Sequence, residues 1–403
     1  MLNIEKSQIK SLEEKGLKDF FDSYVILIET ARRIAKNFEF SPLPILKISQ
    51  MLQECKERTV HITGMGRSGK VGMIFGNLLK NLGYRVSLIG KTYARPVREG
   101  DLVIAFSGSG WTRTTALNIE DSLKNKAYTA SYTSNLNSKI ARLSDHVIPI
   151  IVAEDKETAE NSYDSRQLEG RIAPLTPLGT VFELTSMFVT FAVTSTLVHD
   201  SPLYGFVNGA SSILDNADKT LASLTADPKN IKSVVKLLEN CSSVKNTDPP
   251  QVFCLGSGIS NVISSISGMR FQHLRINIQS VYDWRFRNKG DILIAISGSG
   301  ETSQTLDYIK QARETGMKVI SLTSYGESTM ARESDYHLLI HGREKGGSSY
   351  VEKQQIDPVS RTGYYNPSFE YCAAVTCDAL VAQIAADLDI TEDTMKKEHA
   401  NIE

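Results

Sequence analysis

The sequence contains two related halves. Residues 107–112 have the sequence Ser-Gly-Ser-Gly-Trp-Thr, and residues 297–302 have the sequence Ser-Gly-Ser-Gly-Glu-Thr. Each segment follows an apolar run that begins just after a Gly-Asp pair, and an aspartate stands 38 residues after the first serine in both. The offset between matching positions changes only from 192 to 190 to 187 along the chain. This tandem duplication predicts one fold that is present twice, in a copy one and a copy two.

Within each copy, short apolar segments alternate with segments of helical pattern. This alternation predicts an α/β protein in which parallel strands form a sheet that helices cover on both faces. A helical preface precedes each sheet, and the boundary is expected near residue 202, which gives domains 1–202 and 203–403. The predicted strands lie near 59–63, 86–89, 102–106, 127–132 and 146–151 in copy one, and near 251–255, 276–281, 292–296, 317–322 and 336–340 in copy two.

The two Ser-Gly-Ser-Gly segments have the composition of an anion-binding turn. Each stands between a buried strand and a helix, where unpaired backbone N–H groups and the helix dipole favour a negative charge. Glycine permits close approach of the backbone, and serine and threonine hydroxyls add donors. One copy alone would be interpreted as an ordinary turn with a helix cap. Two matched copies at the carboxyl ends of parallel strands favour phosphate sites.

Composition argues against several classes of partner. The 403 residues have a formal net charge of −1, which gives no basic field for nucleic acid or an anionic membrane. No apolar run approaches the roughly 18 to 20 residues of a membrane span. The first residues lack the order of a signal peptide, so a cytoplasmic location is expected. The five cysteines form no C-x-x-C pair and the seven histidines no H-x-x-x-H pair, which predicts buried free thiols and no protein-bound metal.

Two further motifs recur in both copies. Residues 64–69 and 256–261 form a Gly-x-Gly-x-Ser segment after the first strand, and Phe-Glu at 182–183 and 369–370 opens a long apolar helix. The Gly-x-Gly-x-x-Gly pattern at 64–69 would by itself suggest a dinucleotide site. No acidic residue ends the next strand to bind a ribose, so that interpretation is not favoured.

These motifs together resemble the sugar isomerase (SIS) domain of phosphosugar isomerases and phosphosugar-sensing regulators. Segments at 64–69, 90–92, 177–184 and 398–403 more narrowly resemble 6-phospho-3-hexuloisomerase. The resemblance covers nearly the whole chain, whereas the hexuloisomerases normally have one such domain per chain. It implies a flavodoxin-like sheet of five parallel strands in each copy, sites formed where two domains meet, and no metal or redox cofactor.

The resemblance also implies isomerisation through an enediol, with 3-hexulose 6-phosphate to fructose 6-phosphate as the best single reaction. Such chemistry needs a base, a group that moves a hydroxyl proton, and a remote phosphate anchor. Glu370, or Glu183 in copy one, is the candidate base, although a glutamate in a helix's first turn also favours the dipole without any catalytic role. His399 is the candidate proton shuttle. The residues assigned to the phosphate are Ser297, Ser299, Thr302, Ser303, Ser107, Ser109, Thr112, Arg67 and Ser68.

The two copies differ at the predicted site. Trp111 in copy one stands where copy two has Glu301, and an indole there could narrow or plug the phosphate loop. Copy two has Ile259 in place of Arg67, and copy one has no counterpart of the C-terminal tail. Because each copy keeps what the other lacks, we predict a pseudo-dimer with one competent composite site. Copy two would supply the phosphate loop and the tail, and copy one would supply the Arg67 loop.

Other interpretations stay open. The enzymatic alternatives are a phosphoglucose, phosphomannose or glucosamine-6-phosphate isomerase or deaminase, and the non-catalytic alternative is a phosphosugar-sensing regulator. The long loops at 151–178 and 341–366, with Arg171, Arg361 and Tyr365, are candidate lids. A sugar phosphate is the expected partner, with neither nucleic acid nor membrane. Single-domain relatives assemble as tetramers, so the resemblance predicts a homodimer of this double-length chain.

Overall fold

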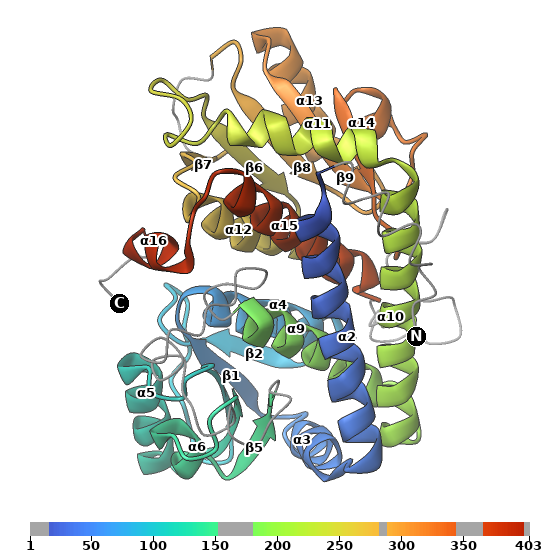
Figure 1. Ribbon diagram of the computed structural model, residues 1–403. Coiled ribbons are helices and arrows are strands. Elements are labelled where there is room, and N and C mark those ends of the chain that lie inside the picture. Colours follow the sequence, from blue (N-terminus) through green and yellow to red (C-terminus); the bar gives the residue numbers. More distant parts are fainter. Residues whose placement is uncertain (1–15, 152–179, 282–287, 344–365, 399–403) are drawn as a thin grey trace.

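The computed structural model describes residues 16–151, 180–281, 288–343 and 366–398. It contains two five-stranded parallel sheets, one in each copy (Figure 1). The strand orders are β2-β1-β3-β4-β5 and β7-β6-β8-β9-β10, the same order in both copies. The predicted α/β fold with two flavodoxin-like sheets is therefore confirmed. The strands are β1 (Thr59–Gly64), β2 (Arg85–Leu88), β3 (Leu102–Phe106), β4 (Tyr128–Thr133) and β5 (His146–Pro149), then β6 (Val252–Gly256), β7 (Ile278–Ser280), β8 (Ile292–Ile296), β9 (Lys318–Thr323) and β10 (Tyr336–Leu339).

Helices cover both faces of each sheet. The central strands β3 and β8 are buried along their whole length, which their unbroken apolar sequences require. The faces that point toward the middle of the molecule carry α4 (Gly66–Asn81) and α9 (Thr180–Thr196) in copy one, and α12 (Ile259–Gln272) and α15 (Ser368–Asp387) in copy two (Figure 1). The outer faces carry α5 (Arg113–Lys124), α6 (Lys139–Leu143), α13 (Ser303–Thr315) and α14 (Thr329–Arg332).

The preface helices connect the two copies. The long helices α2 (Lys18–Phe40) and α10 (Pro202–Ala226) run beside both sheets (Figure 1). The helix α2 from the start of copy one packs along α15 of copy two, and α10 from the start of copy two packs along α9 of copy one. Each preface therefore covers the long apolar helix of the other copy that begins at the Phe-Glu motif. The domain boundary near residue 202 stays a prediction.

Shorter helices complete the preface of each copy. The helix α3 (Leu43–Glu54) packs on the edge strand β5, and α11 (Pro228–Glu239) packs on the edge strand β10. Arg32 Nη2 donates to Asp218 Oδ1 at 3.0 Å, and Tyr24 Oη donates to the carbonyl oxygen of Ala217 at 3.1 Å, so polar contacts join α2 to α10. Near the C-terminus, α16 (Glu392–Lys397) follows α15.

The helix α15 is long and apolar enough to cross a membrane by length and composition. In this structure 94% of its most apolar window is buried inside the protein. Two of its charged residues, Glu370 and Asp378, are buried too and have side-chain partners. These are the properties of a core helix, packed between α2, α10 and α12.

Candidate functional site

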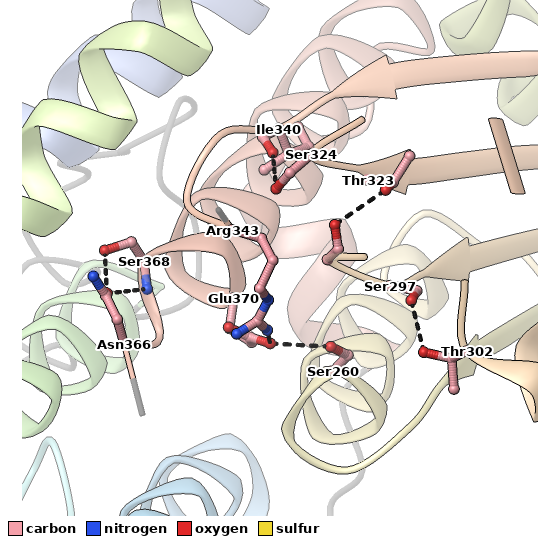
Figure 2. A network of polar contacts seen from close by, with 11 residues as sticks. Ser260, Ser297, Thr302, Thr323, Ser324, Ile340, Arg343, Asn366, Ser368 and Glu370 are labelled. Atoms are coloured by element: carbon pink, nitrogen blue, oxygen red, sulfur yellow. Dashed lines mark hydrogen bonds and ion pairs between the residues drawn. The ribbon is translucent and has the colours of Figure 1, made fainter. Parts of the chain in front are cut away.

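The two Ser-Gly-Ser-Gly loops have matching hydrogen bonds. Ser107 Oγ lies 3.0 Å from Thr112 Oγ1, and Ser297 Oγ lies 3.0 Å from Thr302 Oγ1. In each loop the carbonyl oxygen of the first glycine accepts a hydrogen bond of 3.2 Å from the last threonine of the neighbouring strand. Figure 2 shows these contacts for copy two. Of the predicted phosphate residues, Ser107 and Thr112 therefore come together at the carboxyl end of β3, and Ser297 and Thr302 at the carboxyl end of β8.

The threonine at the start of each following helix does not cap that helix. Thr112 and Thr302 occupy the N-cap positions of α5 and α13, and neither side chain accepts a hydrogen bond there. By contrast, Ser138 and Ser328 accept a backbone N–H bond at the N-caps of α6 and α14. A helix N-terminus whose cap hydroxyl turns toward a neighbouring serine keeps first-turn N–H groups for another acceptor. This is what binding of a phosphate oxygen requires.

A glutamate stands beside each loop. Glu183 and Glu370 lie in the first turns of α9 and α15, as the sequence predicts. A Cβ atom on the first glycine of the loop would lie 3.0 Å from the Phe182 ring in copy one and 3.1 Å from the Phe369 ring in copy two. Each loop therefore packs on the residue that precedes the glutamate, which brings a candidate phosphate anchor and a candidate base together.

The serine of each Gly-x-Gly-x-Ser segment contacts the glutamate of its own copy. Ser68 Oγ donates to Glu183 Oε1 at 3.5 Å, and Ser260 Oγ donates to Glu370 Oε1 at 3.2 Å. These serines lie in the first turns of α4 and α12. The helix that follows the first strand is thereby linked to the glutamate in both copies.

The arginine partners of the two glutamates come from different elements. Arg67, in the first turn of α4, places Nη1 3.7 Å from Glu183 Oε2. In copy two Ile259 occupies the corresponding position, and Arg343, which follows β10, donates from Nη2 to Glu370 Oε1 at 2.7 Å (Figure 2). Sequence reasoning missed Arg343, because copy one has alanine at the corresponding position of the duplication.

The two glutamates consequently have different environments. The Glu183 side chain is 12% exposed, and its Oε1 accepts a hydrogen bond of 3.5 Å from Ser68. Burial raises the pKa of Glu183, and the positive charge of Arg67 opposes that rise only in part. Glu370 is fully buried, and one of its oxygens accepts hydrogen bonds from both Ser260 and Arg343. Glu183 is therefore the glutamate whose carboxylate is less tightly bound.

The remaining predicted residues of the loops have these positions. Ser109 and Ser299 are exposed, and each accepts a hydrogen bond of 3.2 Å from the backbone N–H two residues later. Ser303 is exposed at the start of α13. Trp111 is 55% exposed, so its indole is not packed inside the copy-one loop.

Some predictions are not decided by the described contacts. Arg67 and Ser68 contact Thr180 and Glu183, which belong to copy one. The composite site that joins Arg67 to the copy-two loop stays a prediction. His399 and the candidate lid residues Arg171, Arg361 and Tyr365 lie outside the described residues.

Comparison with known proteins shows the family to which the chain belongs. The family model of the SIS domain matches residues 52–169 and 247–351, one segment in each copy. The chain belongs to the SIS domain family. Both matched segments include the Ser-Gly-Ser-Gly loop of their copy, so the two loops described above are equivalent parts of two SIS domains.

Similar proteins support this assignment. A protein of Aeropyrum pernix is 40% identical over 132 residues, which are 33% of this chain and 62% of that protein. The 3-hexulose-6-phosphate isomerase of Mycobacterium gastri is 33% identical over 199 residues, which are 49% of this chain and 90% of that protein. The crystal structure of tagatose-6-phosphate ketose/aldose isomerase from Escherichia coli superposes with a TM-score of 0.57 at 16% identity, covering 92% of this chain and 94% of that one. At that identity the superposition shows the fold, here over both SIS domains.

Proposed function

We propose that this protein is a phosphosugar isomerase that moves a proton between adjacent carbons of a sugar phosphate through an enediol. The main support is the packing of a phosphate-binding type of loop on the phenylalanine that precedes a glutamate, which is present in both SIS domains. The similarity to a 3-hexulose-6-phosphate isomerase over 90% of that protein supports 3-hexulose 6-phosphate as the substrate and fructose 6-phosphate as the product.

In the proposed mechanism the loop of copy one binds the phosphate. The hydroxyls of Ser107, Ser109 and Thr112 and the first-turn N–H groups of α5 would donate to its oxygens. A phosphate anchor that is remote from the reacting carbons holds the sugar in one orientation over the base. The loop of copy two would offer the same donors through Ser297, Ser299 and Thr302.

The base in this proposal is Glu183. Its carboxylate would take the proton from C2 of the 3-hexulose, giving a C2–C3 enediol, and would return it to C3 while the hydroxyl proton moves from O2 to O3. A carboxylate whose pKa is raised by burial is a better proton acceptor than an exposed one. The positive charge of Arg67 nearby would stabilise the negative charge that develops on the oxygens. His399 keeps its predicted role in moving the hydroxyl proton.

We assign the reaction to Glu183 rather than Glu370 because of their partners. Glu370 is fully buried and accepts a 2.7 Å hydrogen bond from Arg343, so its carboxylate is occupied. Glu183 is partly exposed, and its arginine lies farther away. This assignment implies that the SIS domain of copy one is catalytic and that the SIS domain of copy two is similar in structure but not catalytic.

Deuterium exchange tests the proposal. The protein is incubated with fructose 6-phosphate in D₂O and the sugar is followed by proton NMR. Loss of the C3 proton signal supports the hexulose reaction, and loss at C1 instead indicates an aldose–ketose pair. Binding of the sugar phosphate with no exchange over hours contradicts the isomerase proposal and indicates a phosphosugar sensor.

Paired variants test the assignment of residues. Glu183→Gln is expected to slow exchange by about 10² to 10⁴-fold, since the base is lost, whereas the matched control Glu370→Gln should keep most of the rate. Thr112→Ala should weaken sugar phosphate binding by about tenfold, with Thr302→Ala as the control in the other domain. Loss of exchange in Glu370→Gln alone would place the reaction in copy two.

A further inference from the structure

A chain of buried polar side chains crosses the interface between the two SIS domains. Arg67 Nη1 on α4 donates to Thr180 Oγ1 on α9 at 3.0 Å, and Thr180 Oγ1 donates to Asp378 Oδ1 on α15 at 3.4 Å. The same Asp378 oxygen accepts a 2.7 Å bond from Arg270 Nε on α12. Asp378 of copy two therefore receives one hydrogen bond from each copy.

The buried charge pair belongs to copy two alone. In the register of the duplication, copy one has Leu78 where copy two has Arg270, and Phe191 where copy two has Asp378. All four side chains are buried or nearly so, and the sheet and helices form in both copies. Placing two charges in a protein interior costs free energy that apolar residues at the same positions do not cost. The fold therefore does not require this pair, and its position next to Thr180 suggests another use.

The pair lies close to the proposed base. Thr180 begins the helix whose first turn contains Glu183, and Arg67 contacts both of these residues. Any displacement of Asp378 would therefore release Thr180, which in turn holds the guanidinium of Arg67 beside Glu183. Within copy two, Arg270 Nη1 is hydrogen-bonded to His273 Nδ1 at 3.1 Å.

We propose that Asp378 is a positioning residue that acts across the domain interface on Glu183 of the other SIS domain, through Thr180 and Arg67. The proposal rests on the proposed function, because it assigns Asp378 a part in the surroundings of the catalytic base. It also gives copy two a role in the reaction of copy one. The two SIS domains would then form one catalytic unit although only one contains the base.

Charges on the helices around α9 give this proposal a direction. Burial raises the pKa of Glu183; Arg67 lowers it most, Arg270 lowers it less, and the negative charge of Asp378 raises it. His273 contacts this group through its hydrogen bond to Arg270. Asp378→Asn removes a charge that raises the pKa and leaves Arg270 without its counter-charge. The asparagine Oδ1 still offers Thr180 an acceptor, so Arg67 stays beside Glu183. Both charge changes then favour the carboxylate form of Glu183, so its pKa should fall.

The experiment measures kcat and KM against pH for the wild type and for Asp378→Asn. We expect the acidic limb of kcat/KM to move to lower pH by at least roughly half a unit, with KM changed less than about twofold. A merely structural role would lower the melting temperature and kcat together and leave the limb in place, and that result overturns the proposal. The double variant Arg270→Leu, Asp378→Phe, which installs the copy-one residues, removes both charges. The acidic limb of kcat/KM for this double variant should not move to lower pH. A shift to lower pH as large as that of Asp378→Asn would also overturn the proposal.

A second measurement does not depend on turnover. Because the pKa of Glu183 is raised in the folded state, this carboxyl keeps its proton to higher pH in the folded protein than in the unfolded chain, where it titrates near about pH 4.3. Glu183 therefore contributes stability that is lost as pH rises through its folded pKa, and Glu183→Gln removes this dependence. In Asp378→Asn the folded pKa of Glu183 should lie closer to its unfolded pKa, so the pH range over which this stability is lost should narrow. If the wild-type protein has no turnover but the pH range narrows in Asp378→Asn, only the proposed function is refuted. If the wild-type protein turns over and the pH range is unchanged in Asp378→Asn, only the role of Asp378 is refuted.

Discussion

Replacement of Gly300 by alanine should destabilise the protein more than its backbone conformation alone explains. Gly300 has φ of +66°, and an added Cβ would lie 2.3 Å from Ser328 Oγ. Gly90 has φ of +81° and nothing within 4 Å of an added Cβ, so it is a matched control for the backbone cost. A left-handed alanine costs about 1–2 kcal/mol, and restriction of the unfolded chain returns about 0.4–1 kcal/mol. Gly90→Ala should therefore lose about 1 kcal/mol.

The close contact adds a further term in Gly300→Ala. Forcing an extra methyl group into a packed site costs about 1–3 kcal/mol, and Ser328 can yield only by leaving the N-cap of α14, where it accepts the Ala331 N–H at 3.2 Å. The total loss should be about 2–4 kcal/mol. Gly110→Ala, the copy-one counterpart, should behave alike, because its Cβ would lie 2.0 Å from Ser138 Oγ.

Urea unfolding of the three variants measures these losses, provided that the slope of the transition is unchanged. A loss in Gly300→Ala within about 0.5 kcal/mol of that in Gly90→Ala would refute the steric reasoning. The same variants report on function. If the copy-one loop binds the substrate phosphate, Gly110→Ala should reduce sugar phosphate binding more than Gly300→Ala does.

Two further predictions concern titrating groups outside the loops. The carboxylate of Asp101 accepts two backbone N–H bonds and contacts His61 Nε2 at 3.1 Å; burial alone would raise its pKa, but these bonds lower it overall. Its stabilisation is therefore present above about pH 3.9 and lost as pH falls through the folded pKa. Asp101→Asn should cost about 1–3 kcal/mol of unfolding free energy at pH 7 and progressively less as the pH is lowered. Urea unfolding of the variant and the wild type at neutral and at acidic pH measures this cost, and an equal cost at neutral and acidic pH would contradict the reasoning. Burial raises the pKa of the Cys372 and Cys377 thiols to about 12, so neither should react with a disulfide reagent at pH 8 until the protein is unfolded, and labelling of the native protein at either position would show that the site opens.

Much of the site could be predicted from local sequence. Ser297 to Thr302 and its copy-one counterpart lie in the predicted loops, and Glu183 and Glu370 lie in the predicted first helical turns. Apolar runs, glycines and cap residues act over a few positions, so their spacing alone indicates strands and turns. The duplication strengthened each assignment, because a motif that recurs at the same spacing is unlikely to be accidental.

The partners of the glutamates could not be predicted in the same way. Arg343 is distant in sequence from Glu370 and has no counterpart in copy one, so no motif marks it. Asp378 left a weaker signal, since a lone acidic residue inside an apolar helix needs a buried partner. The identity of that partner, Arg270 on another helix, depends on how the two helices face each other.

The sequence by itself therefore determined the repeated strands, the two Ser-Gly-Ser-Gly loops and the position of a glutamate after each sheet. Only the tertiary structure decided that α2 covers α15 while α10 covers α9, that Arg343 holds Glu370, and that Asp378 reaches Thr180 across the domain interface. The physical reason is the range of the interactions. Backbone geometry and capping are set by neighbouring residues, whereas apolar helix faces accept many partners, and a buried charge finds its counter-charge only when the helices have packed.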